Sequence, residues 1–311
     1  MRSKSDFPKL SGRAVLSPMS GVTDVAFRTL CKRYGAALTY TEFISSTAIV
    51  RGNLNTLKML ETDKSEDPVA VQLFGSSIRD VVDAAKLIED RFDIIDVNCG
   101  CPAWKVVKTG AGSEMLKEPK KVASFINKLA ESVSKPVTVK IRAGIDDDNI
   151  NAIEVAKLVE DAGAAAIAIH GRTQKQGYRG VSNWDLIKQV KAAVSIPVIG
   201  NGDVFSPETL KQRLEESGVD YVMVARGAIG NPFIFTQMNQ FLATGKYDEF
   251  KRIEAFSEYL ELALTYEIDF SSVKQHALTF TKGMQGGAHL RQQVAQVKTI
   301  EELQEQLQSY L

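Results

Sequence analysis

The sequence has little cysteine and no long hydrophobic run. Its three cysteines, Cys31, Cys99 and Cys101, are too few and too unevenly spaced for the disulfide framework of a secreted domain. No segment reaches about 18 consecutive apolar residues, and the first residues lead into no apolar stretch. We therefore expect a cytoplasmic protein in a reducing compartment, without a membrane span or a secretory signal.

The sequence also lacks an excess of charge of either sign. Lys+Arg and Asp+Glu are 38 each, so no overall basic charge points to a nucleic-acid partner. Locally, residues 270–300 contain no Asp or Glu but four cations, at Lys274, Lys282, Arg291 and Lys298. The segment after residue 244 nevertheless carries seven basic and ten acidic residues. Both a phosphate-binding face and an ordinary solvated helix face fit this pattern.

What the sequence does contain is a repeated alternation of short β-branched runs and amphipathic stretches, the pattern of βα units. Helices are expected at Ile78–Arg91, Ala123–Val133, Ala152–Ala162, Trp184–Val194 and Pro207–Ser217. The expected strands are Ala14–Leu16, Leu38–Thr41, Val69–Phe74, Ile94–Asn98, Val137–Ile141, Ala166–His170, Val198–Gly200 and Tyr221–Val224.

Eight such units predict an α/β fold, a (β/α)8 TIM barrel. The alternative is an open doubly wound sheet, although no Gly-x-Gly-x-x-Gly follows the first strand. After Gly245 no further unit appears, and helices are expected at Ile253–Tyr266, Val273–Thr281 and Thr299–Leu311. We therefore expect two domains, a barrel over residues 1–244 and a small C-terminal all-α helical domain over residues 245–311.

Polar or reactive side chains recur at the carboxyl ends of the predicted strands, where barrel enzymes carry their chemistry. Gly202, Arg226 and Gly227, after the last two strands, suit a bound phosphate, although the glycines could also form a simple tight turn. The remaining end residues are Pro18, Met19, Ser20, Gln72, Asn98, Cys101, Lys140, Arg142, His170, Arg172, Asn201, Asp203 and Ala225.

Lys140 lies within an apolar strand, where a charge needs a partner or an anionic ligand. With Gln72 and His170 on nearby strands, it suits a flavin mononucleotide (FMN), whose reduced ring carries negative charge. The other interpretation is a lysine that faces solvent.

Cys99 and Cys101 are separated by one residue, a poor arrangement for a metal, and the histidines form no ligand cluster in the sequence. We expect no metal site. Cys101, between Gly100 and Pro102, is expected at the rim, where its thiol could be a nucleophile or a general acid; the second is favoured because no serine–histidine–carboxylate order surrounds it. The following segment, with Trp104, Lys105 and Lys108, reads as a mobile loop over the site or as a solvated connector.

Taken together, these motifs resemble the tRNA-dihydrouridine synthase family over nearly the whole chain. His276 and Thr281-Lys282-Gly283 also resemble that family's C-terminal helical domain. The other matching segments are Leu16–Asp24, Val71–Leu73, Asp96–Pro102, Lys105–Lys108, Gly110–Ser113, Val139–Arg142, His170–Thr173, Gly200–Asp203 and Ala225–Gly227.

The resemblance implies that the barrel binds FMN, that NADPH (or NADH) reduces the flavin, and that a uridine of tRNA is reduced to 5,6-dihydrouridine. Hydride would pass from flavin N5 to uracil C6, and Cys101 would protonate C5 as the catalytic acid. The target base must leave its stack to reach the barrel mouth. The implied cofactor contacts are Pro18, Met19, Ser20, Gln72, Lys140, His170, Asn201, Gly202, Asp203, Ala225, Arg226 and Gly227.

For the tRNA substrate, the resemblance implies that the helical domain binds RNA. The sequence itself implies no protein partner. Two features depart from the family, the net acidity of the tail and Trp104, which stands where smaller residues are usual. The implied substrate contacts are Asn98, Lys105, Lys108, Arg142, Arg172, Lys274, His276 and Lys282.

Two other functions stay open at this stage. A flavin-dependent reductase or dehydrogenase of free pyrimidines, acting on dihydroorotate-like substrates, would share the barrel and its phosphate ends. The second is an RNA-binding barrel without turnover. The tail and the Lys-x-x-Lys loop favour a macromolecular substrate, and the joint presence of Cys101, Lys140 and His170 favours catalysis.

Overall fold

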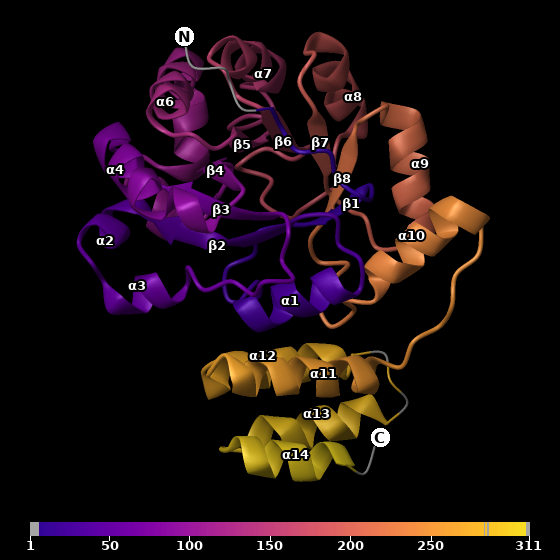
Figure 1. Cartoon of the computed structure of the whole chain (residues 1–311). Helices are drawn as coiled ribbons and strands as arrows, with labels where there is room; N and C mark the ends of the chain where they lie inside the picture. Colours follow the sequence, from indigo (N-terminus) through magenta and orange to yellow (C-terminus); the bar gives the residue numbers. More distant parts are fainter. Residues whose placement is uncertain (1–5, 283, 285, 309–311) are drawn as a thin grey trace.

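A ring of parallel strands forms the centre of the molecule in the computed structural model, which describes residues 6–282, 284 and 286–308 (Figure 1). The sheet order is β1-β8-β7-β6-β5-β4-β3-β2. Two backbone hydrogen bonds of 2.9 Å join its ends, from Leu16 N to Leu38 O and from Ala37 N to Ala14 O. The strands are β1 (Ala14–Leu16), β2 (Thr39–Ser45), β3 (Val69–Phe74), β4 (Ile94–Cys99), β5 (Val137–Arg142), β6 (Ala166–His170), β7 (Val198–Asn201) and β8 (Tyr221–Val224).

The predicted barrel is therefore confirmed and the open sheet is not. The helices around the ring are α1 (Val25–Arg33), α2 (Ser46–Val50), α3 (Leu54–Lys58), α4 (Ile78–Ile88), α5 (Trp104–Val107), α6 (Pro119–Ser132), α7 (Ala152–Asp161), α8 (Trp184–Ala193), α9 (Pro207–Ser217) and α10 (Ile234–Thr244).

Local sequence signals set several of these helix ends. The Ser77 side chain accepts a hydrogen bond from Asp80 N at the start of α4, as an N-cap does. Gly218 ends α9 in the left-handed conformation, with φ +69°. The helix expected over Ile78–Arg91 ends in a 3-10 turn, Glu89–Arg91.

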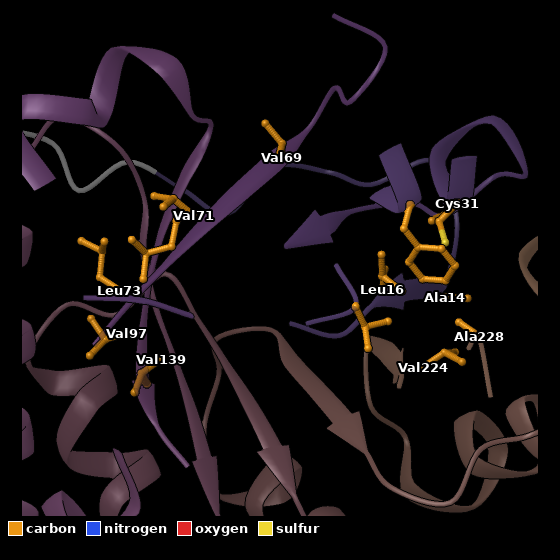
Figure 2. Close-up of a cluster of buried hydrophobic side chains, with 14 of the residues drawn as sticks. Ala14, Leu16, Cys31, Val69, Val71, Leu73, Val97, Val139, Val224 and Ala228 are labelled. Carbon is orange, nitrogen blue, oxygen red and sulfur yellow. The ribbon is translucent and has the colours of Figure 1, made fainter. Parts of the chain in front are cut away.

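Because side chains alternate along a strand, each strand contributes to two apolar layers. Residues such as Tyr40, Ala70, Ile94 and Met223 fill the barrel interior. Their neighbours face the surrounding helices, and Figure 2 shows part of this outer cluster, including Val71, Leu73, Val97 and Val139. Polar residues on the inward face of a strand therefore lie either inside the ring or at its mouth.

The tail forms a separate group of helices outside the ring, below α1 and α10 in Figure 1. Tyr259 packs edge-on against Phe27 of α1, with ring centroids 6.4 Å apart, and the Tyr34 hydroxyl donates to Glu258 over 2.8 Å. The helices are α11 (Arg252–Thr265), α12 (Phe270–Phe280), α13 (Gly287–Gln296) and α14 (Ile300–Gln308). The sequence analysis did not predict α13. Of the last predicted helix, Thr299–Leu311, residues 309–311 lie outside the described residues.

In the part of the chain that the structure describes, none of the helices has both the length and the apolar content that a membrane crossing requires.

Candidate active site

A cavity of about 740 Å³ opens at the carboxyl ends of the strands. Its volume is typical of a small-molecule or cofactor site. Most of the predicted site residues line it, and they come from separate strands and loops, as expected for a barrel enzyme. They are Pro18, Met19, Ser20, Gln72, Asn98, Cys101, Lys105, Lys140, Arg142, His170, Asn201, Gly202, Asp203, Ala225 and Arg226.

Three further predicted residues lie near the cavity without lining it. Gly227 lies behind the wall, where an added Cβ would come 2.4 Å from the Val204 carbonyl oxygen. Arg172 is buried just after β6 and binds Asp203, and Lys108 is exposed at the end of α5.

The tail residues lie away from the cavity. The Lys274 ammonium donates to the carbonyl oxygens of Ala295 and Val297, over 2.7 and 2.8 Å, and so joins α12 to the end of α13. Lys282 is exposed just after α12.

His276 differs from the expected RNA contact, because it is 2% exposed. Its Nε2 lies 3.1 Å from the Val22 carbonyl oxygen and 3.3 Å from Asp24 Oδ2. The side chain therefore joins α12 to the segment after β1, and this burial leaves it no surface for RNA.

A continuous hydrogen-bond relay runs from inside the barrel to Cys101. The buried Asp96 carboxylate accepts from Thr138 Oγ1 over 2.6 Å and from Gln72 Nε2 over 2.7 Å. The Gln72 Oε1 atom accepts from Asn98 Nδ2 over 2.7 Å. The Asn98 Oδ1 atom then accepts the backbone N–H groups of Gly100 and Cys101, over 3.1 and 2.9 Å.

Strand register explains why these side chains meet. Gln72 pairs with Asp96 across β3 and β4, and Asp96 pairs with Thr138 across β4 and β5. Asn98 is two residues beyond Asp96, so it faces inward one layer higher, beside Lys140. Burial is the main cause that raises the pKa of Asp96, to about 6, with hydrogen bonds from Thr138 and Gln72 acting against it. At neutral pH the carboxylate is ionised and can only accept, which fixes the direction of every bond in the relay.

Asp96 was not among the predicted site residues. The signal was available: a charge in the apolar run Ile94–Val97 is the same pattern that identified Lys140.

Cys101 is half-buried, and the backbone around it is well anchored. Its carbonyl oxygen accepts from Ser113 N over 3.1 Å and from Ser113 Oγ over 2.8 Å. Burial raises the pKa of the thiol, and the Ala103 N–H, Arg142 and Lys140 lower it by less. The thiol is therefore protonated at neutral pH and can donate a proton.

Lys140 is half-buried, and its Nζ lies 3.4 Å from Asn201 Oδ1. Burial, followed by the nearby Arg142, lowers the pKa of Lys140 to about 8. Arg142 itself is held by the carbonyl oxygens of Gly100, Thr173 and Gly177, over 2.8 to 2.9 Å. An anion bound beside Lys140 would relieve this excess of positive charge.

On the opposite wall, Asp203 organises the ends of β6 to β8. It accepts from Arg172 over 2.9 and 2.7 Å, from Arg226 over 3.0 Å and from Ser182 N over 2.8 Å. Burial raises the pKa of Asp203, but these partners outweigh it and hold the pKa below the ordinary value. Burial and the surrounding cations lower the pKa of His170 to about 2, so its imidazole is neutral.

Aromatic residues at the mouth were also missed by the sequence reasoning. Tyr178 and Phe205 are exposed and lie on the Arg226 guanidinium, with ring centroids 5.1 and 5.5 Å from Cζ. They come from loops outside the predicted strands, so no strand-end pattern identified them.

Cys99 is fully buried, with its Sγ 3.7 Å from Met115 Sδ. Among residues 6–282, 284 and 286–308, no three His, Cys, Asp or Glu side chains gather as a metal ion would require.

The structure is a parallel (β/α)8 barrel, with a thiol, a lysine and arginines around one cavity at the carboxyl ends of its strands. This arrangement is typical of TIM-barrel enzymes. Solved structures share this fold. Morphinone reductase in complex with tetrahydroNAD aligns with a TM-score of 0.55 and 14% identity, covering 77% of this chain and 89% of that chain. Histamine dehydrogenase from Rhizobium sp. 4-9 aligns with a TM-score of 0.59 and 14% identity, covering 81% and 49%. At such identities the likeness shows the fold alone.

Sequence comparison identifies the family. The dihydrouridine synthase (Dus) family model matches residues 15–311. A probable tRNA-dihydrouridine synthase 1 of Synechocystis sp. is 38% identical over 302 residues, covering 94% of this chain and 84% of that protein. A tRNA-dihydrouridine synthase B of Pseudomonas aeruginosa is 41% identical over 239 residues, covering 76% and 72%. The chain belongs to the dihydrouridine synthase family, which confirms the resemblance.

Proposed function

We propose that this protein reduces uridines of tRNA to 5,6-dihydrouridine, with FMN as its cofactor and NADPH as its reductant. The observation that carries the proposal is the placement of the protonated Cys101 thiol and the desolvated Lys140 ammonium in one cavity, in a chain of this family.

The residues present fit FMN. Lys140 is a half-buried cation whose hydrogen-bond partner is a neutral amide, so the negative edge of a reduced ring would complete its environment. At the other end, Arg226 offers a guanidinium with 43% of its side chain exposed, suitable for a phosphate. Gly202 has φ +129°, and an added Cβ there would lie 2.2 Å from Ser182 Oγ, so only glycine can form this part of the wall.

When bound, FMN supplies the hydride that reduces the C5=C6 bond, after its own reduction by NADPH. We assign its contacts to the cavity residues of β1, β3, β5 and β6, and to the loops after β7 and β8. We expect the ring to contact Gln72, His170 and Lys140, which all line the cavity.

The protein's own residues would deliver the proton and hold the base. The Cys101 Sγ–H is the acid for uracil C5, because burial keeps the thiol protonated. Asn98 fixes the backbone that carries this thiol through its two backbone contacts. Since a uridine stacked in tRNA cannot reach the mouth of a barrel, the base must be extruded. We assign contacts with its phosphates to Lys105, which lines the cavity.

The C-terminal helices would form the RNA-binding unit. We place the domain boundary after Thr244, where Gly245 ends α10 with φ +74°. Lys282 and Lys298 are exposed on this unit and available for phosphates. A cytoplasmic location fits both a tRNA substrate and the three free cysteines.

The test is an anaerobic half-reaction followed at the flavin absorbance. The holoenzyme is reduced with NADPH and then mixed with unmodified tRNA, or separately with free uridine and orotate. We expect reoxidation by tRNA only, with dihydrouridine in the recovered RNA. Reoxidation by the free pyrimidines and not by tRNA would overturn the proposal in favour of a small-molecule reductase, and a chain that cannot be loaded with FMN would overturn the cofactor assignment.

A further inference from the structure

Trp104 is unusual for its exposure. It is 75% exposed, whereas Trp184, the other tryptophan of the chain, is 6% exposed. Tryptophan normally buries most of its surface, so an exposed indole suggests a binding surface. The residues on either side of it in the chain, Ala103 and Lys105, line the cavity.

The indole projects from an ordered segment. Trp104 is the first residue of α5, which Val106 anchors with an exposure of only 4%. The Ala103 carbonyl oxygen accepts from Val106 N and Val107 N, over 2.9 and 3.0 Å. Trp104 follows Cys101 by three positions, so their Cα atoms lie within about 11 Å of each other. The indole is thus carried by an ordered segment close in the chain to Cys101, although Trp104 itself does not line the cavity.

Two cations accompany this ring. Lys105 lines the cavity, and the exposed Lys108 is four residues after Trp104, on the same helical face. A flat apolar ring near two cations is complementary to nucleic acid, since each nucleotide combines a base face with a charged phosphate.

We propose that Trp104 stacks on a base of the tRNA strand next to the extruded uridine. Extrusion leaves neighbouring bases without a stacking partner, and an exposed indole on the segment that follows Cys101 can take that place. Lys105 and Lys108 would hold the phosphates on either side. This inference rests on the proposed reduction of tRNA and names the part of the chain that keeps the substrate strand open.

The first test measures tRNA affinity and turnover for Trp104→Ala and Trp104→Phe holoenzymes. Loss of one base–aromatic stack predicts about 5- to 150-fold weaker tRNA binding for Trp104→Ala. Phenylalanine keeps an aromatic face and should recover most of this loss. Leu87→Ala is the control, because Leu87 is 66% exposed on α4, a helix that contributes no residue to the cavity, whereas α5 contributes Lys105 and Val106. This variant should bind tRNA as the unchanged protein does.

The second test uses intrinsic fluorescence. Because the chain has only two tryptophans, the difference between the emission of the unchanged protein and that of Trp104→Phe isolates Trp104. We expect saturating tRNA to quench this component and to protect it from iodide.

The outcomes separate the two proposals. If tRNA does not reoxidise the flavin of the unchanged protein, the proposed function fails. The stacking role alone is overturned if tRNA reoxidises the flavin of the unchanged protein but Trp104→Ala binds tRNA normally. The same holds if the fluorescence of Trp104 does not change when tRNA is added. A loss in Trp104→Ala that also slows flavin reduction by NADPH would overturn it too, because that half-reaction needs no RNA.

Discussion

Replacing Asp96 with asparagine keeps the shape of the side chain and changes the direction of the hydrogen-bond relay. In the unchanged protein, the Asp96 carboxylate accepts from both Thr138 and Gln72. An amide at this position can accept from Thr138 but presents N–H groups to Gln72. The Gln72 amide must then turn over, and Asn98 after it, so that Asn98 would direct N–H groups at the backbone N–H of Cys101.

The expected effect on stability is opposite to the effect on catalysis. The pKa of Asp96 is raised to about 6 from 3.8, so keeping it ionised costs about 3 kcal/mol at pH 7. The substitution removes that cost, but the mispaired amide destabilises the folded state by about 1–3 kcal/mol. The free energy of unfolding of Asp96→Asn should therefore equal that of the unchanged protein or exceed it by up to about 2 kcal/mol.

The sign of the pH dependence provides a check. Because the folded-state pKa is raised, the folded chain holds a proton that the unfolded chain has lost between about pH 4 and pH 6. As the pH rises from about 4 to about 6, the free energy of unfolding of the unchanged protein therefore falls relative to that of the variant. Below pH 4 the two should differ little in this contribution, and above pH 6 the gain of the variant should be complete.

Catalysis should fall in the step that uses the thiol. A displaced Cys101 backbone moves the acid from its productive position, and an error of about 1 Å costs roughly 100-fold in rate. We expect flavin reoxidation by tRNA to slow about 10- to 100-fold in Asp96→Asn. Thr138→Val is the control: it removes one donor to Asp96 without reversing the relay, and should slow this step only a few-fold.

The alkylation rate of Cys101 by a maleimide reports the relay directly, because Cys31 and Cys99 are fully buried. Asp96→Asn should change this rate, and adding Gln72→Glu should restore it, since a carboxylate at position 72 can accept from the new amide and from Asn98. An unchanged alkylation rate and normal reoxidation in Asp96→Asn would refute the reasoning. A loss of activity that merely follows a loss of stability would refute it as well.

Other perturbations test the rest of the cavity. Cys101→Ala should keep FMN and its reduction by NADPH but lose about 100-fold or more of dihydrouridine formation in single turnovers. Lys140→Met should raise the melting temperature of the FMN-free protein, because a desolvated cation is removed, while weakening FMN binding measured by fluorescence titration. Lys105→Ala and Lys108→Ala should each reduce the slope of log affinity for tRNA against log salt concentration by about 1. His170 should show the nitrogen shifts of a neutral imidazole from pH 5 to pH 8; protonation within that range would contradict its lowered pKa of about 2.

The barrel was predictable because its signals are local. Strands such as Val69–Phe74 are short apolar runs, and helices such as Pro207–Ser217 have a cap, a periodic face and a terminal glycine. Where these signals are weak, the prediction failed. Helix α13 has two glycines beside its start and a mixed polar sequence, and its stability comes from burial of Leu290 and Val294 against neighbouring helices.

The site was predictable to the extent that it lies at strand ends. That rule selected Cys101 and Lys140, which the structure brings to one cavity, but it cannot separate a residue that lines the cavity from one that is buried behind its wall. Arg172 is of the second kind, buried and bound to Asp203. His276 shows the same difficulty in the tail, because its burial depends on contacts with Val22 and Asp24, some 250 residues earlier in the sequence.

The two walls of the cavity are each organised by one carboxylate, and the environments of the two carboxylates differ. Asp96 is buried among neutral donors, so its charge is costly and serves to fix the direction of a relay toward Cys101. Asp203 lies between Arg172 and Arg226, which stabilise its charge while it positions them. The wall that carries Cys101 is therefore sensitive to protonation of Asp96 near pH 6. The wall that carries Arg172 and Arg226 keeps its arrangement well below that pH, because Asp203 stays ionised there. Acidification should consequently impair the proton-transfer step before it impairs retention of FMN, and a single-turnover pH series on the holoenzyme would detect the order of these losses.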